Sequence, residues 1–178
     1  MDAGEVDDDT INVNLNGTAQ VFRTGPQLGI RLHSIDVKFG TSVDKKYIVL
    51  NAGLHAVNDD GSRGARLTGF SYGDKKNNIM NRFWAREQIE LEPSTAYMFV
   101  LECSYGCANN NYLNIRRVSD DAEDEGSAEG WSIANGRILP SDNWTPKPRT
   151  HSLKISVQGT SGHPRVVEDS FEIISSPV

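Results

Sequence analysis

The sequence contains no hydrophobic run long enough to cross a membrane. None of its segments approaches the ~20 consecutive apolar residues that a bilayer-spanning helix requires. Residues 1–5 are acidic and include neither a basic nor an apolar segment, which argues against a signal peptide. We therefore interpret the chain either as a cytoplasmic protein or as a segment of a longer secreted protein. The motifs described below favour the second interpretation.

Clustered basic charge is also missing. The net charge is -6, the isoelectric point is about 5.2, and the 18 lysines and arginines are scattered along the chain. Their densest runs are pairs such as Arg116-Arg117. Because a phosphate backbone is bound by clustered basic side chains, this composition argues against nucleic acid as a partner.

Motifs of catalysis are missing as well. The four histidines lie singly, and none belongs to a His-Glu-x-x-His or similar metal-binding motif. No Gly-x-Ser-x-Gly nucleophile motif occurs either. We therefore expect no catalytic residues and no enzymatic activity. A pair of carboxylates for glycoside hydrolysis is recognised only by its separation in space, so a sandwich-fold hydrolase or lyase remains the weakest alternative.

Cysteine occurs only twice, at Cys103 and Cys107. Two sulfurs four residues apart can close a small ring across a turn if the backbone folds back. A zinc site would need a second pair of ligands, and the sequence has no other cysteine to provide it. We expect a Cys103–Cys107 disulfide, with two free thiols as the alternative. Such a bond would indicate an oxidising compartment.

Apolar and polar residues alternate over much of the chain, which is the pattern of strands with one buried face. The alternation is clear in residues 11–15, 35–39, 113–116 and 153–157. Residues 96–101 are apolar throughout, as expected of a central strand covered on both faces. About eight to ten such strands between turn residues predict an all-β fold, an antiparallel β-sandwich resembling a jelly roll.

Asn-Gly pairs predict two hairpins, because both central residues of the favoured hairpin turn need positive φ. Asn16-Gly17 separates residues 11–15 from 18–22, and Asn135-Gly136 separates residues 131–134 from 137–139.

Residues 78–92 fit two secondary structures. They match an amphipathic helix that ends at Pro93, but the alternation of Met80, Arg82 and Trp84 favours a strand. At the level of the chain, we expect one domain over residues 1–160. Residues 161–178 would then form either an additional strand or a linker to a following domain.

Four stretches together resemble a known module. They read AQVFRTG at 19–25, EPSTAY at 92–97, SDDAEDEG at 119–126 with GWSI at 130–133, and LKISVQGT at 153–160. In order and spacing they are similar to the motifs of a choice-of-anchor-type β-sandwich module found in large bacterial surface and secreted proteins. The chain departs from that module at Cys103, Cys107 and residues 77–86.

The resemblance implies a non-catalytic extracellular module, either a spacer or an adhesive, ligand-binding unit, and it implies no established chemistry. The expected location is the cell surface or the extracellular space. The expected partners are neighbouring domains of the same chain and a glycan or the surface of a host or partner cell.

The acidic stretch is a candidate metal site. Asp120, Asp121, Glu123 and Asp124 lie in a loop between two expected strands. Calcium takes about six to eight oxygen ligands, which loop carboxylates and backbone carbonyls can supply. The spacing of an EF-hand is missing, so the loop is either a structural calcium site or a solvated acidic turn.

Aromatic residues in loops are candidate ligand sites. Carbohydrate-binding sandwiches present exposed aromatic rings to the faces of sugars. Trp144 is the first candidate for such a ring, followed by Tyr105 and Tyr112, whereas Trp131 at the start of a strand is expected in the core. A carbohydrate-binding module, with or without calcium, is therefore the main alternative function.

Overall fold

The computed structural model describes residues 11–13, 17–27, 29–40, 48–106, 113–115, 117–119, 130–133, 144, 151–153 and 155–161. The regular elements in this part of the chain are strands. They are β1 (Ile11–Val13), β2 (Thr18–Arg23), β3 (Ile30–Lys38), β4 (Val49–Val57), β5 (Arg63–Tyr72), β6 (Met80–Leu91), β7 (Ala96–Tyr105), β8 (Leu113–Ile115), β9 (Arg117–Ser119), β10 (Ser132–Ile133), β11 (His151–Leu153) and β12 (Ile155–Ser161). Within these residues, no helix is long or apolar enough to cross a bilayer.

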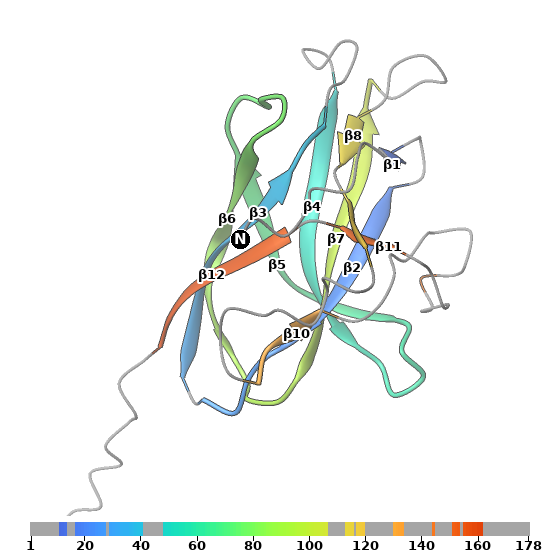
Figure 1. Ribbon diagram of the computed structural model, residues 1–178. Coiled ribbons are helices and arrows are strands. Elements are labelled where there is room, and N and C mark those ends of the chain that lie inside the picture. The colour runs from blue at the N-terminus through green and yellow to red at the C-terminus, as the bar shows by residue number, and fades with distance from the viewer. Residues whose placement is uncertain are drawn as a thin grey trace, which may run out of the picture.

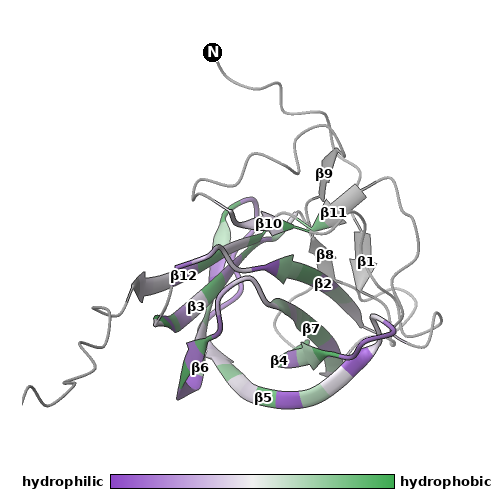
Figure 2. Ribbon diagram, turned by 90° about the horizontal axis from the view of Figure 1, so that it is seen from below, coloured by the Kyte–Doolittle hydropathy of each residue, from purple (hydrophilic) through white to green (hydrophobic). Residues whose placement is uncertain are grey.

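One eight-stranded antiparallel sheet dominates the molecule (Figure 1). Its strand order is β10-β2-β7-β4-β5-β6-β3-β12, and two short ladders, β1 with β8 and β9 with β11, accompany it. Seen from below, the strands follow an arc from β12 and β3 through β5 and β4 to β2, so that the sheet is a half-barrel (Figure 2). The all-β, antiparallel prediction is confirmed.

Aromatic side chains on the concave face of the sheet form the main core. Phe99 of β7 lies at its centre, with ring centroids 5.3 Å from Phe70 and 5.8 Å from Phe83. Phe39 extends this group, since its ring lies 6.1 Å from that of Phe83. All four side chains are fully or almost fully buried. Burial of these large rings supplies much of the driving force that curls the sheet.

Strand β7 is buried on both of its faces, as its unbroken apolar sequence predicted. Tyr97, Phe99 and Leu101 point into the main core. Met98 and Val100 point the other way and form a second cluster, the outer cluster, with Ala19 and Val21 of β2. The prediction of a central strand is therefore confirmed.

The last two described strands connect opposite ends of the arc. The backbone N–H of Leu153 in β11 donates a hydrogen bond of 2.9 Å to the side-chain oxygen of Gln20 in β2. Two residues later, Ile155 pairs with Val37 of β3, at the other end of the sheet. Leu153 itself is completely buried in the main core. This segment thus ties the β2 end of the half-barrel to its β3 end.

The predicted hairpin at Asn16-Gly17 is wrong. Strand β1 pairs with β8, while β2 pairs with β7. Gly17 does have the positive φ of 80° that its sequence suggested. Its other constraint is a close approach, since a Cβ there would lie 2.5 Å from the carbonyl oxygen of Leu101. The glycine therefore lets the chain pass against β7 and does not turn β1 onto β2.

Two other expectations have different outcomes. Residues 80–91 form β6, so the preference for a strand over a helix is confirmed. The predicted hairpin at Asn135-Gly136 and the C-terminal segment 162–178 lie outside the described residues.

Candidate functional site

Polar residues of the AQVFRTG and EPSTAY stretches hold the fold together. The hydroxyl of Thr24, which is almost completely buried, donates to the carbonyl of Glu92 at 2.6 Å and accepts from the N–H of Thr95 at 2.9 Å. The Tyr97 hydroxyl accepts from the N–H of Glu92 at 2.8 Å. These bonds fix the turn between β6 and β7 against the end of β2. Their polar groups are therefore used inside the fold.

Trp131 also has a structural position. Its ring stacks on that of Phe22, with centroids 6.3 Å apart and planes 11° from parallel, and it packs against the main core. Trp131 is half-buried. It therefore lies at the edge of the core in which the sequence places it. The preceding Gly130 has φ of 76°, and a Cβ there would lie 2.6 Å from the ring of Pro26.

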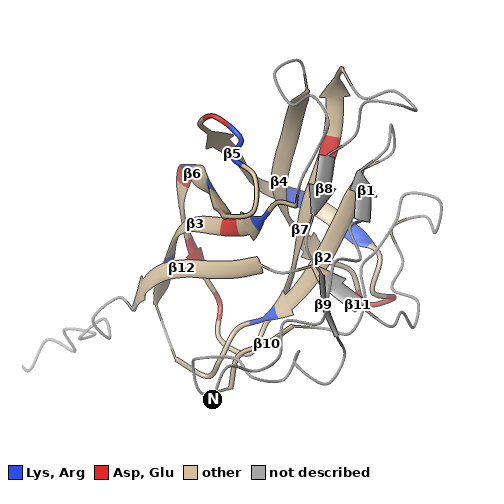
Figure 3. Ribbon diagram, turned by 45° about the horizontal axis from the view of Figure 1, so that its top comes forward, with Lys and Arg blue, Asp and Glu red and all other residues tan. Residues whose placement is uncertain are grey.

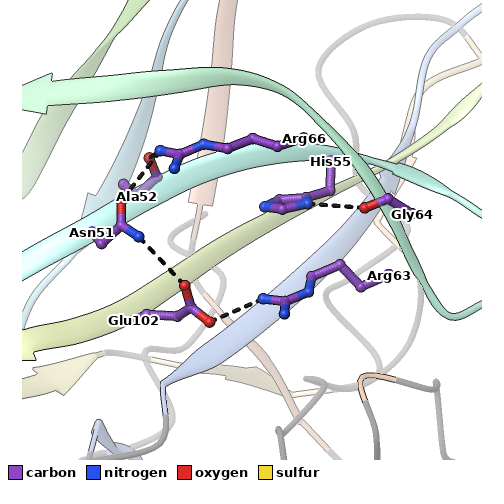
Figure 4. A network of polar contacts seen from close by, with 7 residues as sticks. All are labelled: Asn51, Ala52, His55, Arg63, Gly64, Arg66 and Glu102. Atoms are coloured by element: carbon purple, nitrogen blue, oxygen red, sulfur yellow. Dashed lines mark hydrogen bonds and ion pairs between the residues drawn. The ribbon is translucent and has the colours of Figure 1, made fainter.

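A polar network crosses the convex face of β4, β5 and β7 (Figure 4). Glu102 accepts a hydrogen bond of 2.9 Å from Arg63 and one of 3.5 Å from Asn51. Arg66 donates to the side-chain oxygen of Asn51 at 3.2 Å and to the carbonyl of Ala52 at 2.9 Å. The network joins three neighbouring strands, with Arg63 paired to Glu102 and Arg66 bound to the amide oxygen of Asn51 and a backbone carbonyl.

Glycines leave the space in which Arg66 lies. Gly53 and Gly69 face each other in β4 and β5, and a Cβ on Gly53 would come within 3.0 Å of the Arg66 guanidinium. The ring of His55 lies beside them, and its Nδ1 donates to the carbonyl of Gly64 at 3.1 Å. Burial lowers the pKa of His55, and repulsion from Arg63 and Arg66 lowers it further. The imidazole is therefore kept neutral as a structural donor.

Trp144, the first aromatic candidate from the sequence, contacts this network. The guanidinium of Arg63 lies 4.4 Å above its ring centroid, a cation–π geometry. Trp144 is half-buried and packs against the outer cluster. One face of the ring is thus already occupied by Arg63, and the role of Trp144 as a sugar platform stays a prediction.

The other predicted site residues have varied placements. Tyr105 is 71% exposed at the end of β7. Tyr112, the acidic residues Asp120, Asp121, Glu123 and Asp124, and Cys107 lie outside the described residues. The described part of the chain holds no free cysteine, and the Cys103–Cys107 bond stays a prediction. Within the described residues, no group of three or more His, Cys, Asp or Glu side chains could hold a metal.

A pocket of about 320 Å³ opens at the hairpin of β5 and β6, and we call it the hairpin pocket. It is lined by residues 72–76 and 79–84 together with Phe39. The side chain of Asn81 shapes the loop by donating to the carbonyls of Lys76 and Ile79 at 2.8 and 2.9 Å. The N–H of Lys76 donates back to Asn81 at 2.6 Å. These hydrogen bonds fix the conformation of the loop that forms one wall of the pocket, so we call the pocket braced.

Exposed apolar side chains gather at the hairpin pocket. Ile79 is 48% exposed, Met80 37% and Trp84 49%. Met80, Arg82 and Trp84 alternate on the convex side of β6, while Asn81 and Phe83 between them are buried. Exposed apolar groups that adjoin one pocket are a common sign of a binding surface.

Charged groups surround these apolar side chains. Figure 3 shows acidic and basic residues next to each other in the loop that joins β5 to β6. The amine of Lys75 lies 5.3 Å from the ring centroid of Tyr72, and burial lowers its pKa. Arg82 is held by Asp36 of β3 through two hydrogen bonds of 2.8 and 2.7 Å.

Sequence reasoning missed the hairpin pocket. The one signal was the alternation at Met80, Arg82 and Trp84, which places a tryptophan on a face with polar neighbours. Its exposure depends on residues that are distant in sequence, since Trp84 pairs with Ser34 of β3 and Ser71 of β5. Both neighbours are too small to cover an indole ring.

Comparison with known proteins gave no relative. No family model, no curated protein and no solved structure matches the chain.

Proposed function

We propose that the chain is a non-catalytic, ligand-binding module of an extracellular bacterial surface protein, and that its ligand docks at the hairpin pocket. The observation that carries this proposal is the gathering of Ile79, Met80 and Trp84, each more than a third exposed, around one braced pocket. A spacer has no need for exposed apolar side chains beside a preformed cavity, so an adhesive role is favoured over a spacer role.

The use of polar side chains supports the non-catalytic part of the proposal. Arg63 of β5 binds Glu102 of β7, and Arg66 of β5 binds the side-chain oxygen of Asn51 and the carbonyl of Ala52 in β4. His55 binds the carbonyl of Gly64 and stays neutral. Thr24, at the end of β2, binds the turn before β7. These contacts give each group a structural partner in place of a substrate.

The outer cluster supports a finer proposal about the fold. Ala19, Val21, Met98 and Val100 face away from the main core, yet all are buried. A cover over the convex side of β2 and β7 is what a sandwich would provide. We propose that the half-barrel is one layer of such a sandwich, in keeping with the resemblance to the bacterial module.

A binding array tests the function directly. The labelled chain is applied to immobilised glycans and cell-surface proteins, while soluble products released from the same surfaces are measured. We expect retention without product release, and loss of retention in Trp84→Ala. The control is Leu67→Ala, which removes a 38% exposed apolar side chain outside the pocket. Product release in proportion to the amount of protein would contradict the proposal, and a complete lack of retention would favour a spacer.

A further inference from the structure

We infer that the hairpin pocket binds an acidic saccharide, a sugar chain whose rings carry carboxylates. This inference rests on the proposed function and adds the chemical class of the ligand. It combines an open tryptophan ring, two lysine amines at the pocket that take part in no ion pair with the described residues, and strands whose backbone is already paired.

Trp84 is the surface on which a sugar ring would lie. Its ring is 49% exposed, and its partners in the neighbouring strands are Ser34 and Ser71. Because neither serine can cover an indole, the ring stays open, and Ser71 adds an exposed hydroxyl beside it. A flat aromatic ring packs against the C–H face of a sugar while nearby polar groups bind its hydroxyls.

Basic groups give the pocket a charge opposite to that of the whole chain. Lys75 and Lys76 line the pocket and outnumber the lining carboxylate of Asp74, and Arg86 lies outside the pocket on the same exposed side of β6 as Trp84. Among the described residues, no ion pair engages Lys75 or Lys76, whereas Arg82 is already paired with Asp36. The molecule as a whole carries a net charge of -6, so the two lysines give the pocket a local positive charge that attracts an anionic ligand.

Lys75 has the environment of an anion-binding amine. Its partial burial lowers its pKa, with Asp74 as the nearby charge that acts in the opposite direction. A ligand carboxylate would supply further negative charge and favour the ammonium form. The cost of burying this amine is thereby offset when the ligand is bound.

The strand pairing argues against an extended peptide as the ligand. Peptides that add to a sheet need an unpaired strand edge. Strand β6 lies between β5 and β3, which bind its two sides. The pocket therefore offers a ring face and amines, but no backbone edge, at Trp84.

Titration calorimetry with four probes of matched length tests the inference. The probes are oligogalacturonate, its neutral methyl ester, a hyaluronan oligosaccharide and oligoglutamate. We expect an acidic saccharide to bind, its affinity to fall as salt is added, and the methyl ester to bind about tenfold more weakly. Trp84→Ala and the double variant Lys75→Ala/Lys76→Ala should each weaken binding of the acidic probe about tenfold.

Two variants control for folding and for chemistry. Leu67→Ala should bind like the parent chain, and Trp84→Phe should recover part of the affinity lost in Trp84→Ala. All variants must keep the parent melting temperature, because Trp84, Leu67 and Lys76 are exposed and Lys75 is only half-buried.

Three results would overturn the inference. Equal affinity for oligogalacturonate and its ester would show a neutral saccharide site, which leaves the proposed function intact. Oligoglutamate binding as tightly as the saccharides would show attraction by charge alone. Lack of binding to both acidic saccharides would reject the ligand class, and the array then decides separately whether the module binds any ligand at Trp84.

Discussion

Thr24 joins the end of β2 to the turn between β6 and β7 through one small side chain. Its hydroxyl donates to the carbonyl of Glu92 and accepts from the N–H of Thr95, while its own N–H donates to the carbonyl of Thr95. Only 1% of its surface is exposed. In such a place the loss of the hydroxyl leaves partly buried backbone groups without partners, which costs more than the net value of the bonds.

Replacing Thr24 with valine should therefore destabilise the protein. The shape of the side chain is kept, but the N–H of Thr95 loses its acceptor, so we expect a loss of about 2–3 kcal/mol in the free energy of unfolding. Urea denaturation measures it. Thr24→Ser keeps the hydroxyl and should lose less; equal losses in the two variants would assign the role of Thr24 to its methyl group.

His55 should make stability depend on pH. Its pKa in the folded chain lies below the ordinary value of 6.5, because burial and two arginines disfavour the imidazolium. The unfolded chain then binds the proton more readily, so stability falls as the pH drops through 6.5 towards the lower folded value. In the variant His55→Gln, the side-chain amide can still donate to the carbonyl of Gly64, but the side chain no longer binds a proton in this pH range.

The comparison is made by urea denaturation at about pH 7.5 and 5.5, on either side of the ordinary histidine pKa. The parent chain should lose more stability than His55→Gln over this interval. Parallel losses would mean that the other histidines or the carboxylates cause the pH dependence.

At the scale of elements, short-range patterns predicted strands but not their partners. The alternation in β3 and the apolar sequence of β7 follow from which faces are buried, a local property. The pairing of β2 with β7 is set instead by contacts over long sequence separations, among them those of Thr24. For that reason a correct turn residue, Gly17, led to a wrong hairpin.

The hairpin pocket could not be predicted from the sequence for the same reason. A tryptophan in an alternating strand was visible in the sequence, but its exposure is set by Ser34 and Ser71, which flank it from two other strands. The sequence favours Trp144 as the exposed aromatic ring because loops are usually exposed. In the fold it lies against the outer cluster, below the Arg63 guanidinium.

The three tryptophans should therefore differ in their access to a quencher. Trp84 is 49% exposed, whereas Trp131 and Trp144 are both half-buried against apolar clusters. Acrylamide quenching of the fluorescence should fall most when Trp84 is replaced by phenylalanine, and less when Trp131 or Trp144 is replaced. If the Trp144 variant shows the largest fall, Trp144 is the open ring and the platform belongs there.

At the scale of the molecule, the half-barrel depends on ties between segments that are distant in sequence. Leu153 and Ile155 link β2 to β3, and β9 pairs with β11 directly before that link. Residues 120–126 of the acidic stretch follow β9 in the sequence, and Gly130 lies against Pro26 next to β2. A ligand of that stretch would thus connect a short ladder to the β2 end of the sheet.

Calcium is the ligand that the acidic stretch predicts. Asp120, Asp121, Glu123 and Asp124 repel one another in any compact state, and a divalent cation would remove that repulsion. A ligand that binds only the folded chain stabilises it by about 2.7 kcal/mol at roughly a hundred times its Kd. For a domain of this size that corresponds to a rise of about 5–10 °C in the melting temperature.

The measurement compares melting curves in chelator and in millimolar calcium. Chelator should lower the melting temperature, added calcium should restore it, and Asp121→Ala or Asp124→Ala should abolish the difference. Lys75→Ala serves as the control, because it removes a charge at the hairpin pocket and should leave the calcium effect unchanged. Superimposed curves for the parent chain would make the acidic stretch a solvated turn. The connection between the β9–β11 ladder and β2 would then depend on protein contacts, such as those of Gly130 with Pro26 and of Trp131 with Phe22.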